Sequence, residues 1–341
     1  MARRRRRSKS FLSRWKFNKL PFYPMAVLSL LGTGGYLGCN SDAIPQWLQQ
    51  QTATEVQQAG ARINESAIPA RTEKTILVGS FNLKQFGPSK LKDQWVMQRI
   101  SEVIRCFDVI ALQEVTSKDQ EAVRILLECV NKNGARYEFS KSPRIGRTKN
   151  AEQYVFLWDT TRIHAGQKYT YVVTDESDLM HREPFVGRFQ VATSQQPFRF
   201  LLINVHTDPD ETTQELNALA YVYDSVRRYE YPEDDILLLG DLNARPGKLL
   251  DLEKDPALVS LVNVPTNTRK DKTYDNFVIN QYATTEFSGR SGTLDLESAF
   301  GINQEDALRI SDHLPIWAEF SIYENQRAGS VAAVPGNSPG L

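Results

Sequence analysis

Short apolar runs alternate with amphipathic stretches through most of this chain. Apolar runs bounded by polar residues predict buried strands at 75–81, 108–113 and 235–240. Stretches in which apolar residues recur with the helical period predict helices at 90–106, 118–131 and 211–229. Further strands are predicted at 136–140, 152–159, 168–174, 185–191, 199–206, 274–279 and 314–321. Early strands that alternate with helices, followed by hairpin-like strands, predict a mixed α/β body with helices covering the sheet faces.

The pattern divides the chain into four parts: a leader at 1–41, a linker at 42–73, a body at 74–322 and a loose tail at 323–341. The leader joins a basic start to an apolar run at 25–31 that glycines end, which predicts an export signal. The expected location is therefore periplasmic, secreted or membrane-anchored. The segment before Cys39 resembles the end of a bacterial lipoprotein signal, and cleavage, lipid anchoring at Cys39 and an uncleaved anchor all stay open. The alternative is a disordered Arg-rich segment that contacts nucleic acid or anionic lipid.

Charge is distributed unevenly along the chain. The whole sequence has 41 basic and 41 acidic residues. Residues 1–40 hold nine of the basic and none of the acidic residues, which leaves 32 basic against 41 acidic, a net charge of about nine negative. A body of this kind does not grip nucleic acid by bulk electrostatics. If it handles phosphate, metal ions have to supply much of the positive charge.

The three cysteines are too few for a disulfide framework and lack the clustering of a zinc site. Cys106 and Cys129 fall in predicted helices and are expected to be thiols of the core.

Polar residues that can take part in catalysis or bind metal stand at the ends of the apolar strands. They are Asn82, Gln113 and Glu114, Asn204 and His206, Asp241 and Asn243, and the segment Ser311-Asp312-His313 before the last strand. A polar group beside a buried strand is costly unless it reaches a cleft or a partner. Five such strand ends predict one shared cleft.

These residue types suit metal-assisted phosphate chemistry. Asn82, Glu114 and Asp312 offer hard oxygen ligands for Mg²⁺. Two histidines can act as base and acid near neutral pH. No Ser or Cys stands in a nucleophile motif, so direct attack by water is favoured. Taken singly, each residue also fits a structural role such as a turn cap, an Asx-turn or a hydrogen-bonded histidine.

In this order the motifs resemble the endonuclease/exonuclease/phosphatase family, and within it the deoxyribonuclease I branch. The family motifs are the Asn, the Gln-Glu, G-D-x-N and S-D-H. The branch adds F-N-L-K-Q-F-G at 81–87, E-Q-Y-V-F-L-W at 152–158, R-E-P-F at 182–185 and S-D-H-L-P at 311–315. The resemblance covers about residues 74–322. It implies a four-layer α/β sandwich of two mixed sheets packed face to face, with helices outside.

The resemblance also implies roles for individual residues. They are two histidine–carboxylate pairs, His206 with Glu152 and His313 with Asp275; a divalent-metal group of Asn82, Glu114 and Asp312; Asp241 and Asn243 at the scissile phosphate; and Arg182 and Tyr154 as further contacts to substrate phosphate. The implied metal is Mg²⁺ or Mn²⁺, with Ca²⁺ as a candidate structural ion.

Two positions depart from the branch. Thr116 stands where deoxyribonuclease I has an arginine that enters the DNA minor groove, and Asn150 stands where it has a tyrosine with the same role. Arg147 and Lys149 are candidates to replace some contacts to the DNA backbone. These changes put duplex preference in doubt more than catalysis.

The sequence thus predicts a monomeric, metal-dependent phosphodiesterase that cleaves nucleic acid, with DNA favoured, endonucleolytically and with 5′-phosphate products. One alternative keeps the site and changes the substrate to a phospholipid or another small phosphodiester, as in sphingomyelinases. The other is a membrane-tethered binding module with a dead site, which the suitable residues at every implied catalytic position disfavour.

Overall fold

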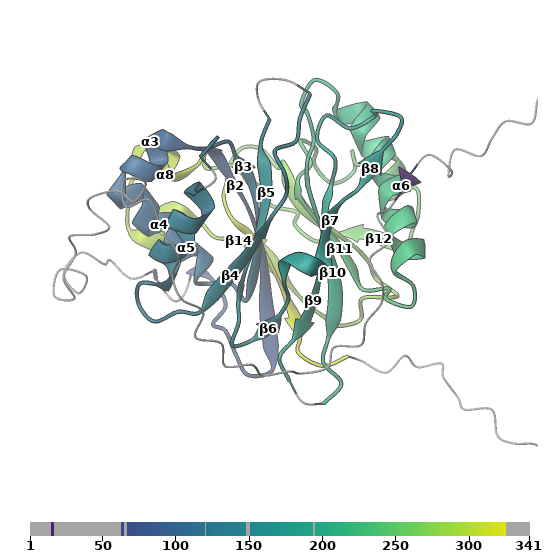
Figure 1. The fold of residues 1–341 in the computed structure, drawn as a ribbon, viewed down its shortest axis with the longest axis horizontal. Coiled ribbons are helices and arrows are strands. Elements are labelled where there is room, and N and C mark those ends of the chain that lie inside the picture. The colour runs from purple at the N-terminus through teal and green to yellow at the C-terminus, as the bar shows by residue number, and fades with distance from the viewer. Residues whose placement is uncertain are drawn as a thin grey trace, which may run out of the picture.

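The computed structural model describes residues 15–16, 63–64, 67–119, 121–147, 151–193 and 195–324. Two large mixed sheets face one another, and helices cover their outer faces (Figure 1). The predicted four-layer sandwich is therefore confirmed. The apolar run of the predicted leader, Cys39 and the tail beyond residue 324 lie outside the described residues. In the part that the structure describes, no helix has the length and apolar character needed to cross a bilayer.

The first sheet has six strands. In spatial order they are β14 (Phe287–Thr293), β15 (Ile316–Ser321), β2 (Thr75–Phe86), β3 (Val109–Val115), β5 (Gln153–Asp159) and β4 (Tyr137–Lys141). Only the β2–β3 pair is parallel, and the other neighbours are antiparallel.

The second sheet has seven strands. In spatial order they are β12 (Leu258–Ser260), β13 (Asp275–Asn280), β11 (Ile236–Asp241), β10 (Arg199–His206), β9 (Phe185–Val191) and β6 (Ile163–His164), with β7 (Thr170–Val172) also paired to β9. Here β10 and β11 form the parallel pair. A separate short pairing joins β1 (Trp15–Lys16) to β8 (Thr174–Asp175).

The two parallel pairs set the position of the site. Strands of a parallel pair end at the same edge of their sheet, so β2 and β3 deliver Asn82 opposite Gln113, and β10 and β11 deliver His206 opposite Asp241. Gln113 Nε2 donates a 2.7 Å hydrogen bond to Asn204 Oδ1 on the other sheet. The C-terminal ends of these four strands therefore meet at one end of the sandwich.

Three apolar layers hold the strands in place. The core between the sheets is rich in stacked rings, such as Phe156 on Phe185 and Phe198 on Phe200. A second cluster packs the first sheet against α3 (Pro88–Lys92), α4 (Gln94–Ile104), α5 (Ala122–Asn131), α7 (Leu296–Phe300) and α8 (Gln304–Ile310). The third packs α6 (Thr212–Glu230) against the second sheet.

Several predicted elements need correction. The helix predicted at 90–106 is two helices, because Asp93 adopts an extended backbone and its side chain caps α4 at Val96 N, 3.2 Å away. The strand predicted at 168–174 is broken into a 3₁₀ turn (Gln167–Tyr169), β7 and β8. Elements that the apolar pattern did not predict are β1, β6, β12, β14, α7, α8 and a 3₁₀ turn at Leu250–Glu253.

The body also extends past its predicted limits. Ile68, placed in the linker, is buried in the first-sheet core. Arg71 forms ion pairs with Asp108 at 2.7 Å and with Asp159 at 2.6 Å. At the other end, the backbone N–H of Glu324 donates to Gln196 O at 2.9 Å. The residues next to both predicted boundaries thus belong to the folded unit.

Both described cysteines are free thiols. Cys129 is buried in α5, as expected, and Cys106 lies just beyond the end of α4 and is half-buried. Burial raises the pKa of each thiol to about 12, which keeps both protonated near neutral pH.

Candidate active site

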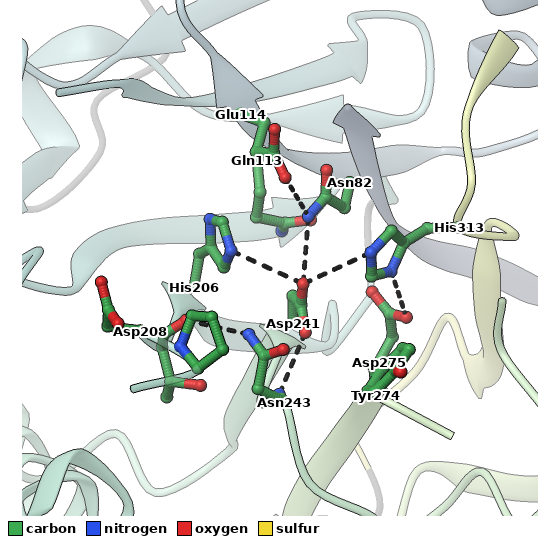
Figure 2. Close-up of polar contacts among 12 residues, drawn as sticks. Asn82, Gln113, Glu114, His206, Asp208, Asp241, Asn243, Tyr274, Asp275 and His313 are labelled. Carbon is green, nitrogen blue, oxygen red and sulfur yellow. Dashed lines mark hydrogen bonds and ion pairs between the residues drawn. The ribbon is translucent and has the colours of Figure 1, made fainter. Parts of the chain in front are cut away.

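The polar strand ends converge at one end of the sandwich. Figure 2 shows His206 and His313 pointing toward Asp241 from opposite sides, with Asn82 and Glu114 beside them. His206 and Asp241 end strands of the second sheet, Asn82 lies in β2 of the first, and His313 lies just before β15. The shared cleft that the sequence predicts thus corresponds to one contact network of residues far apart in the chain.

The strand ends at the site contain backbone conformations that residues other than glycine rarely adopt. Gly240 has φ 139°, and a Cβ at this position would lie 1.9 Å from Val205 O, so only glycine lets β11 run this close to β10 before Asp241. Glu114 and Asn243 have positive φ values of 57° and 47°. Left-handed conformations of such residues cost about 1–2 kcal/mol and cluster at functional sites.

Asp241 is the centre of the network. Its Oδ2 lies 3.6 Å from Nε2 of His206 and 3.6 Å from Nε2 of His313, and it accepts a 3.0 Å hydrogen bond from Asn82 Nδ2. Its Oδ1 accepts the backbone N–H of Asn243 at 3.0 Å. Burial opposes ionisation of this carboxyl, but the charges of His313 and His206 outweigh burial and lower the pKa of Asp241. A buried anion thus lies between two imidazoles.

His206 is held by Glu152, as the resemblance implies. Its Nδ1 lies 3.0 Å from Oε1 and 3.1 Å from Oε2 of that carboxylate. Burial alone would lower the pKa of His206, but the charge of Glu152 raises it above its ordinary value. Because Glu152 engages Nδ1, the Nε2 nitrogen is the one left facing Asp241.

His313 is held by Asp275 in the same way. Its Nδ1 lies 2.8 Å from Asp275 Oδ2, which also accepts a 2.8 Å hydrogen bond from the hydroxyl of Thr266. Burial opposes protonation, but Asp275 and Asp241 together raise the pKa of His313 to about 10. The site therefore contains two imidazoles with the same construction and a shared carboxylate.

Two residues that the sequence analysis did not assign support this geometry. Thr266 orients Asp275 from the loop before β13. Ser311 donates to Asn82 O at 2.7 Å and accepts the backbone N–H of His313 at 3.1 Å, so it joins both sides of the site. Ser311 could have been found from the S-D-H motif, whereas none of the motifs contains Thr266.

Arg182 and Tyr154, which the resemblance implies as contacts to substrate phosphate, both bind the backbone at the end of β10. Tyr154 is fully buried, and its hydroxyl accepts the backbone N–H of His206 at 2.8 Å, so it cannot reach a substrate. Arg182 is only 5% exposed and donates to the backbone carbonyls of His206 at 3.1 Å and Thr207 at 3.2 Å. Both residues position the strand end that carries His206.

Of the three residues expected to bind metal, Asn82 and Glu114 are in direct contact. Asn82 Nδ2 donates to Glu114 Oε1 at 3.0 Å, and Glu114 Oε2 accepts the backbone N–H of Gln85 at 2.8 Å. Asp312 forms a 2.9 Å ion pair with Lys84 Nζ, so a cation already lies against this carboxylate. The donors are amide and carboxylate oxygens, which fit a hard divalent ion. Ligand atoms of Asp241, Asp275 and His313 also lie within 4.8 Å of one another.

The structure describes three of the remaining residues that the sequence analysis named: Asn243, Arg147 and Thr116. Asn243 Nδ2 donates to Thr207 O at 2.9 Å, which leaves its second amide N–H available. Arg147 is engaged by Asp178 and Glu211, each at 2.9 Å. Thr116 is half-buried at the end of β3. Lys149 and Asn150 lie outside the described residues.

Comparison with known proteins gives a consistent result. A model of the Endonuclease/Exonuclease/phosphatase family matches residues 79–295. Deoxyribonuclease gamma of Rattus norvegicus is 30% identical over 269 residues, which span 72% of this chain and 84% of the rat protein. Deoxyribonuclease-1-like 1 of Sus scrofa is 29% identical over 255 residues, which span 71% of this chain and 80% of the pig protein.

Solved structures share the fold. A functionally unknown conserved protein from Enterococcus faecalis superposes with a TM-score of 0.52 at 17% identity, covering 71% of this chain and 98% of that one. Humanized D. rerio TDP2 with 14 mutations gives a TM-score of 0.52 at 15% identity, covering 72% of this chain and 98% of that one. At these identities the likeness concerns the architecture alone.

Proposed function

Because the chain belongs to the endonuclease/exonuclease/phosphatase family and to its deoxyribonuclease I-like branch, we propose that it hydrolyses phosphodiester bonds of nucleic acid, with DNA as the favoured substrate. Enzymes of this family generally depend on a divalent metal ion. We propose Mg²⁺ or Mn²⁺ for this role.

One observation carries the proposal: two imidazoles, each oriented through Nδ1 by a buried carboxylate, present Nε2 to the same anionic position at Asp241. A structural histidine needs one partner. Two histidines with equivalent partners on opposite sides of one point are suited to an in-line displacement, in which one group removes a proton and the other delivers one.

The residues then divide the reaction between them. A phosphodiester bound beside Asp241, between the two histidines, has one imidazole on the side of the attacking water and the other on the side of the leaving oxygen. One Nε2 takes the proton of the water as its oxygen bonds to phosphorus. The bond from phosphorus to the 3′ oxygen breaks, and the other Nε2 protonates that oxygen, which leaves 5′-phosphate and 3′-hydroxyl ends.

Asp241 and Asn243 act on the same phosphate. The carboxylate of Asp241 orients the water, and the free N–H of Asn243 donates to a phosphoryl oxygen. Asn82, Glu114 and Asp312 would hold the divalent ion, which would supply positive charge to the phosphoryl group. Glu152 and Asp275 keep both imidazoles in the required orientation throughout.

The preference for DNA rests on the relatives that are named deoxyribonucleases. Nicking of supercoiled plasmid in Mg²⁺, compared with cleavage of a single-stranded DNA, an RNA and a choline phosphodiester, tests the substrate class. Faster cleavage of the plasmid than of the choline ester supports the proposal, and faster cleavage of the choline ester contradicts it.

The metal is tested with the same assay. Chelator should abolish nicking, and Mg²⁺ should restore it. Glu114→Gln should raise the Mg²⁺ concentration for half-maximal activity by at least about tenfold, because it removes an oxygen anion from the ligand set. An unchanged Mg²⁺ requirement would exclude Glu114 as a ligand.

We further propose that the leader exports the protein and contacts the membrane, and that the enzyme acts as a monomer. The basic start and apolar run of the leader support export. Cell fractionation with N-terminal sequencing of the mature chain tests the first proposal, and light scattering of the purified protein tests the second.

A further inference from the structure

A bulge in β2 lies against the residues expected to bind metal. The register between β2 and β3 shifts between Asn82 and Phe86. Inside this bulge, Lys84 and Gln85 have positive φ values of 42° and 53°. Residues other than glycine rarely adopt left-handed conformations, and two in succession are rarer still. Such conformations cluster at functional sites, so the bulge is a candidate part of the active site.

The bulge places one donor against each of the three expected metal ligands. The backbone N–H of Lys84 donates to Asn82 Oδ1 at 2.9 Å. The backbone N–H of Gln85 donates to Glu114 Oε2 at 2.8 Å. The side chain of Lys84 completes the set, because its Nζ lies 2.9 Å from Oδ2 of Asp312. Two neighbouring residues of one strand thus contact the whole ligand group.

These three contacts do not respond equally to a divalent ion. An amide or carboxylate oxygen has a second lone pair, so Asn82 Oδ1 and Glu114 Oε2 can keep their backbone donors and still bind an ion. The ammonium group of Lys84 differs, because a full positive charge repels a cation at the same carboxylate. Lys84 and a divalent ion therefore compete for Asp312.

The surroundings of Lys84 allow its ammonium group to move. The side chain of Lys84 is 45% exposed, and that of Asp312 is 42% exposed. Exposed ion pairs contribute little to stability, so this pair is broken easily. Lys90 shows the opposite arrangement beside the same bulge, because its Nζ donates to the backbone carbonyls of Leu83 and Ile310. Lys90 thus fixes the bulge to the segment before Asp312, whereas the ammonium of Lys84 is displaceable.

We propose that Lys84 is a displaceable counter-cation of the metal group, which leaves Asp312 when a divalent ion binds and then contacts a phosphate of the nucleic acid. Asp312 directly precedes His313, so the released ammonium starts next to the histidine centre. Lysine has a flexible four-carbon stem and binds phosphate as a point charge. The inference deepens the proposed function and rests on it for the metal group and the substrate class.

The exchange of one ammonium group between two partners couples metal binding to substrate binding. An ion on Asp312 releases Lys84 for a phosphate, and a phosphate that holds Lys84 removes the competitor of the ion. Each ligand then raises the affinity for the other by the same factor. Because the chain beyond residue 40 has a net negative charge, this exchange brings a positive charge to the substrate once the metal site is filled.

The first measurement is the metal affinity without substrate. The full chain, freed of metal by chelator, is titrated calorimetrically with Mn²⁺ at low salt, and the signal that Asp312→Asn weakens identifies the site. Lys84→Gln removes the competing charge, so it should bind Mn²⁺ about three- to tenfold more tightly than the wild type. Lys84→Arg keeps the charge and should stay within about twofold of the wild type.

Lys254→Gln is the matched control for this titration. It removes a lysine that forms an ion pair with Asp251 at 2.6 Å, and neither residue belongs to the metal group. Its Mn²⁺ affinity should equal that of the wild type. Thermal unfolding checks that every variant is folded.

The second measurement is the coupling to nucleic acid. In a His206→Ala background that blocks cleavage, the Mn²⁺ affinity is measured with and without a duplex DNA oligonucleotide. The oligonucleotide should raise this affinity by a factor at least about threefold larger when Lys84 is present than in Lys84→Gln. The variant keeps only the general attraction of phosphates for the cation. In the metal-loaded chain, Lys84→Gln should also reduce the salt dependence of oligonucleotide binding by about one phosphate contact.

Two results would overturn the proposal. Mn²⁺ affinity that is equal or weaker in Lys84→Gln would show that Lys84 positions Asp312 and does not compete for it. Equal coupling with and without Lys84 would show that the ammonium is not passed to a phosphate. Failure of the proposed function is distinguishable, because it would appear as a wild-type chain that binds Mn²⁺ but does not nick plasmid, whereas failure of this inference would appear in a chain that does.

Discussion

The side-chain amide of Asn82 donates a 3.0 Å hydrogen bond to Oδ2 of Asp241, and this bond joins the ends of strands from different sheets. The same nitrogen donates to Glu114 Oε1, also at 3.0 Å. One amide thus fixes the carboxylate between the histidines relative to a carboxylate of the expected metal group. The contact explains how residues 159 positions apart form one site.

Asn82→Ala should therefore lower both activity and stability. It removes the donor from two carboxylates in a fully buried position, and a lost buried hydrogen bond typically costs about 1–3 kcal/mol. Denaturant unfolding and plasmid nicking measure the two effects. Asn303→Ala, which removes only the cap of α8, should cost about 1 kcal/mol and leave nicking unchanged. Equal activity in the two variants would contradict the role of Asn82.

Asp275→Asn and Glu152→Gln should each reduce turnover by about 10²–10⁴-fold. Each substitution keeps the shape of a side chain that holds Nδ1 of a histidine but removes the charge that fixes its tautomer and orientation. Single-turnover nicking by folded protein measures the effect. A loss below about threefold in both variants would show that the pairs are structural.

Arg182→Lys separates positioning from direct contact with substrate. A lysine cannot reproduce the fork that binds the carbonyls of His206 and Thr207, so we expect kcat to fall by about tenfold or more. The salt dependence of KM should stay as in the wild type. A salt dependence reduced by about one phosphate contact would instead restore the phosphate-binding role that the sequence predicts. Arg144→Lys, which alters another carbonyl-binding arginine, is the control.

Gly240→Ala should unfold the site end of β11. The new Cβ would lie 1.9 Å from Val205 O at a φ of 139°, so we expect a loss of at least about 3 kcal/mol of unfolding free energy and no measurable nicking. Gly247→Ala is the matched control, because its φ is also positive, at 81°, but its Cβ meets open space. That variant should lose only about 1 kcal/mol. Similar losses in both variants would show that backbone strain, and not the close approach to β10, explains Gly240.

Much of the fold follows from apolar periodicity, and the exceptions have physical reasons. Strands such as β3 and β11 are nearly continuous apolar runs. By contrast, β14 has the sequence F-S-G-R-S-G-T and lies at a sheet edge. Its side chains are exposed or half-buried, so this strand does not need a run of apolar residues. The helix break at Asp93 depends on a single cap and leaves the apolar period almost unchanged.

The sequence could predict which residues form the site, but it could not predict how they are arranged. The strand-end positions of His206, Asp241 and His313 indicated convergence, and the family motifs indicated their partners. Burial was not visible in the motifs, so neither the buried position of Tyr154 nor the carbonyl contacts of Arg182 could be predicted from them.

The most direct test of the central claim is the turnover of His206→Ala and His313→Ala on supercoiled plasmid in Mg²⁺, with folding checked by thermal unfolding. Removal of a general acid or base typically costs about 10²–10⁴-fold, so each variant should lose at least about 100-fold. The double variant should be little slower than either single one, because the two groups act as a unit. Turnover equal to that of the wild type in both single variants would contradict the account.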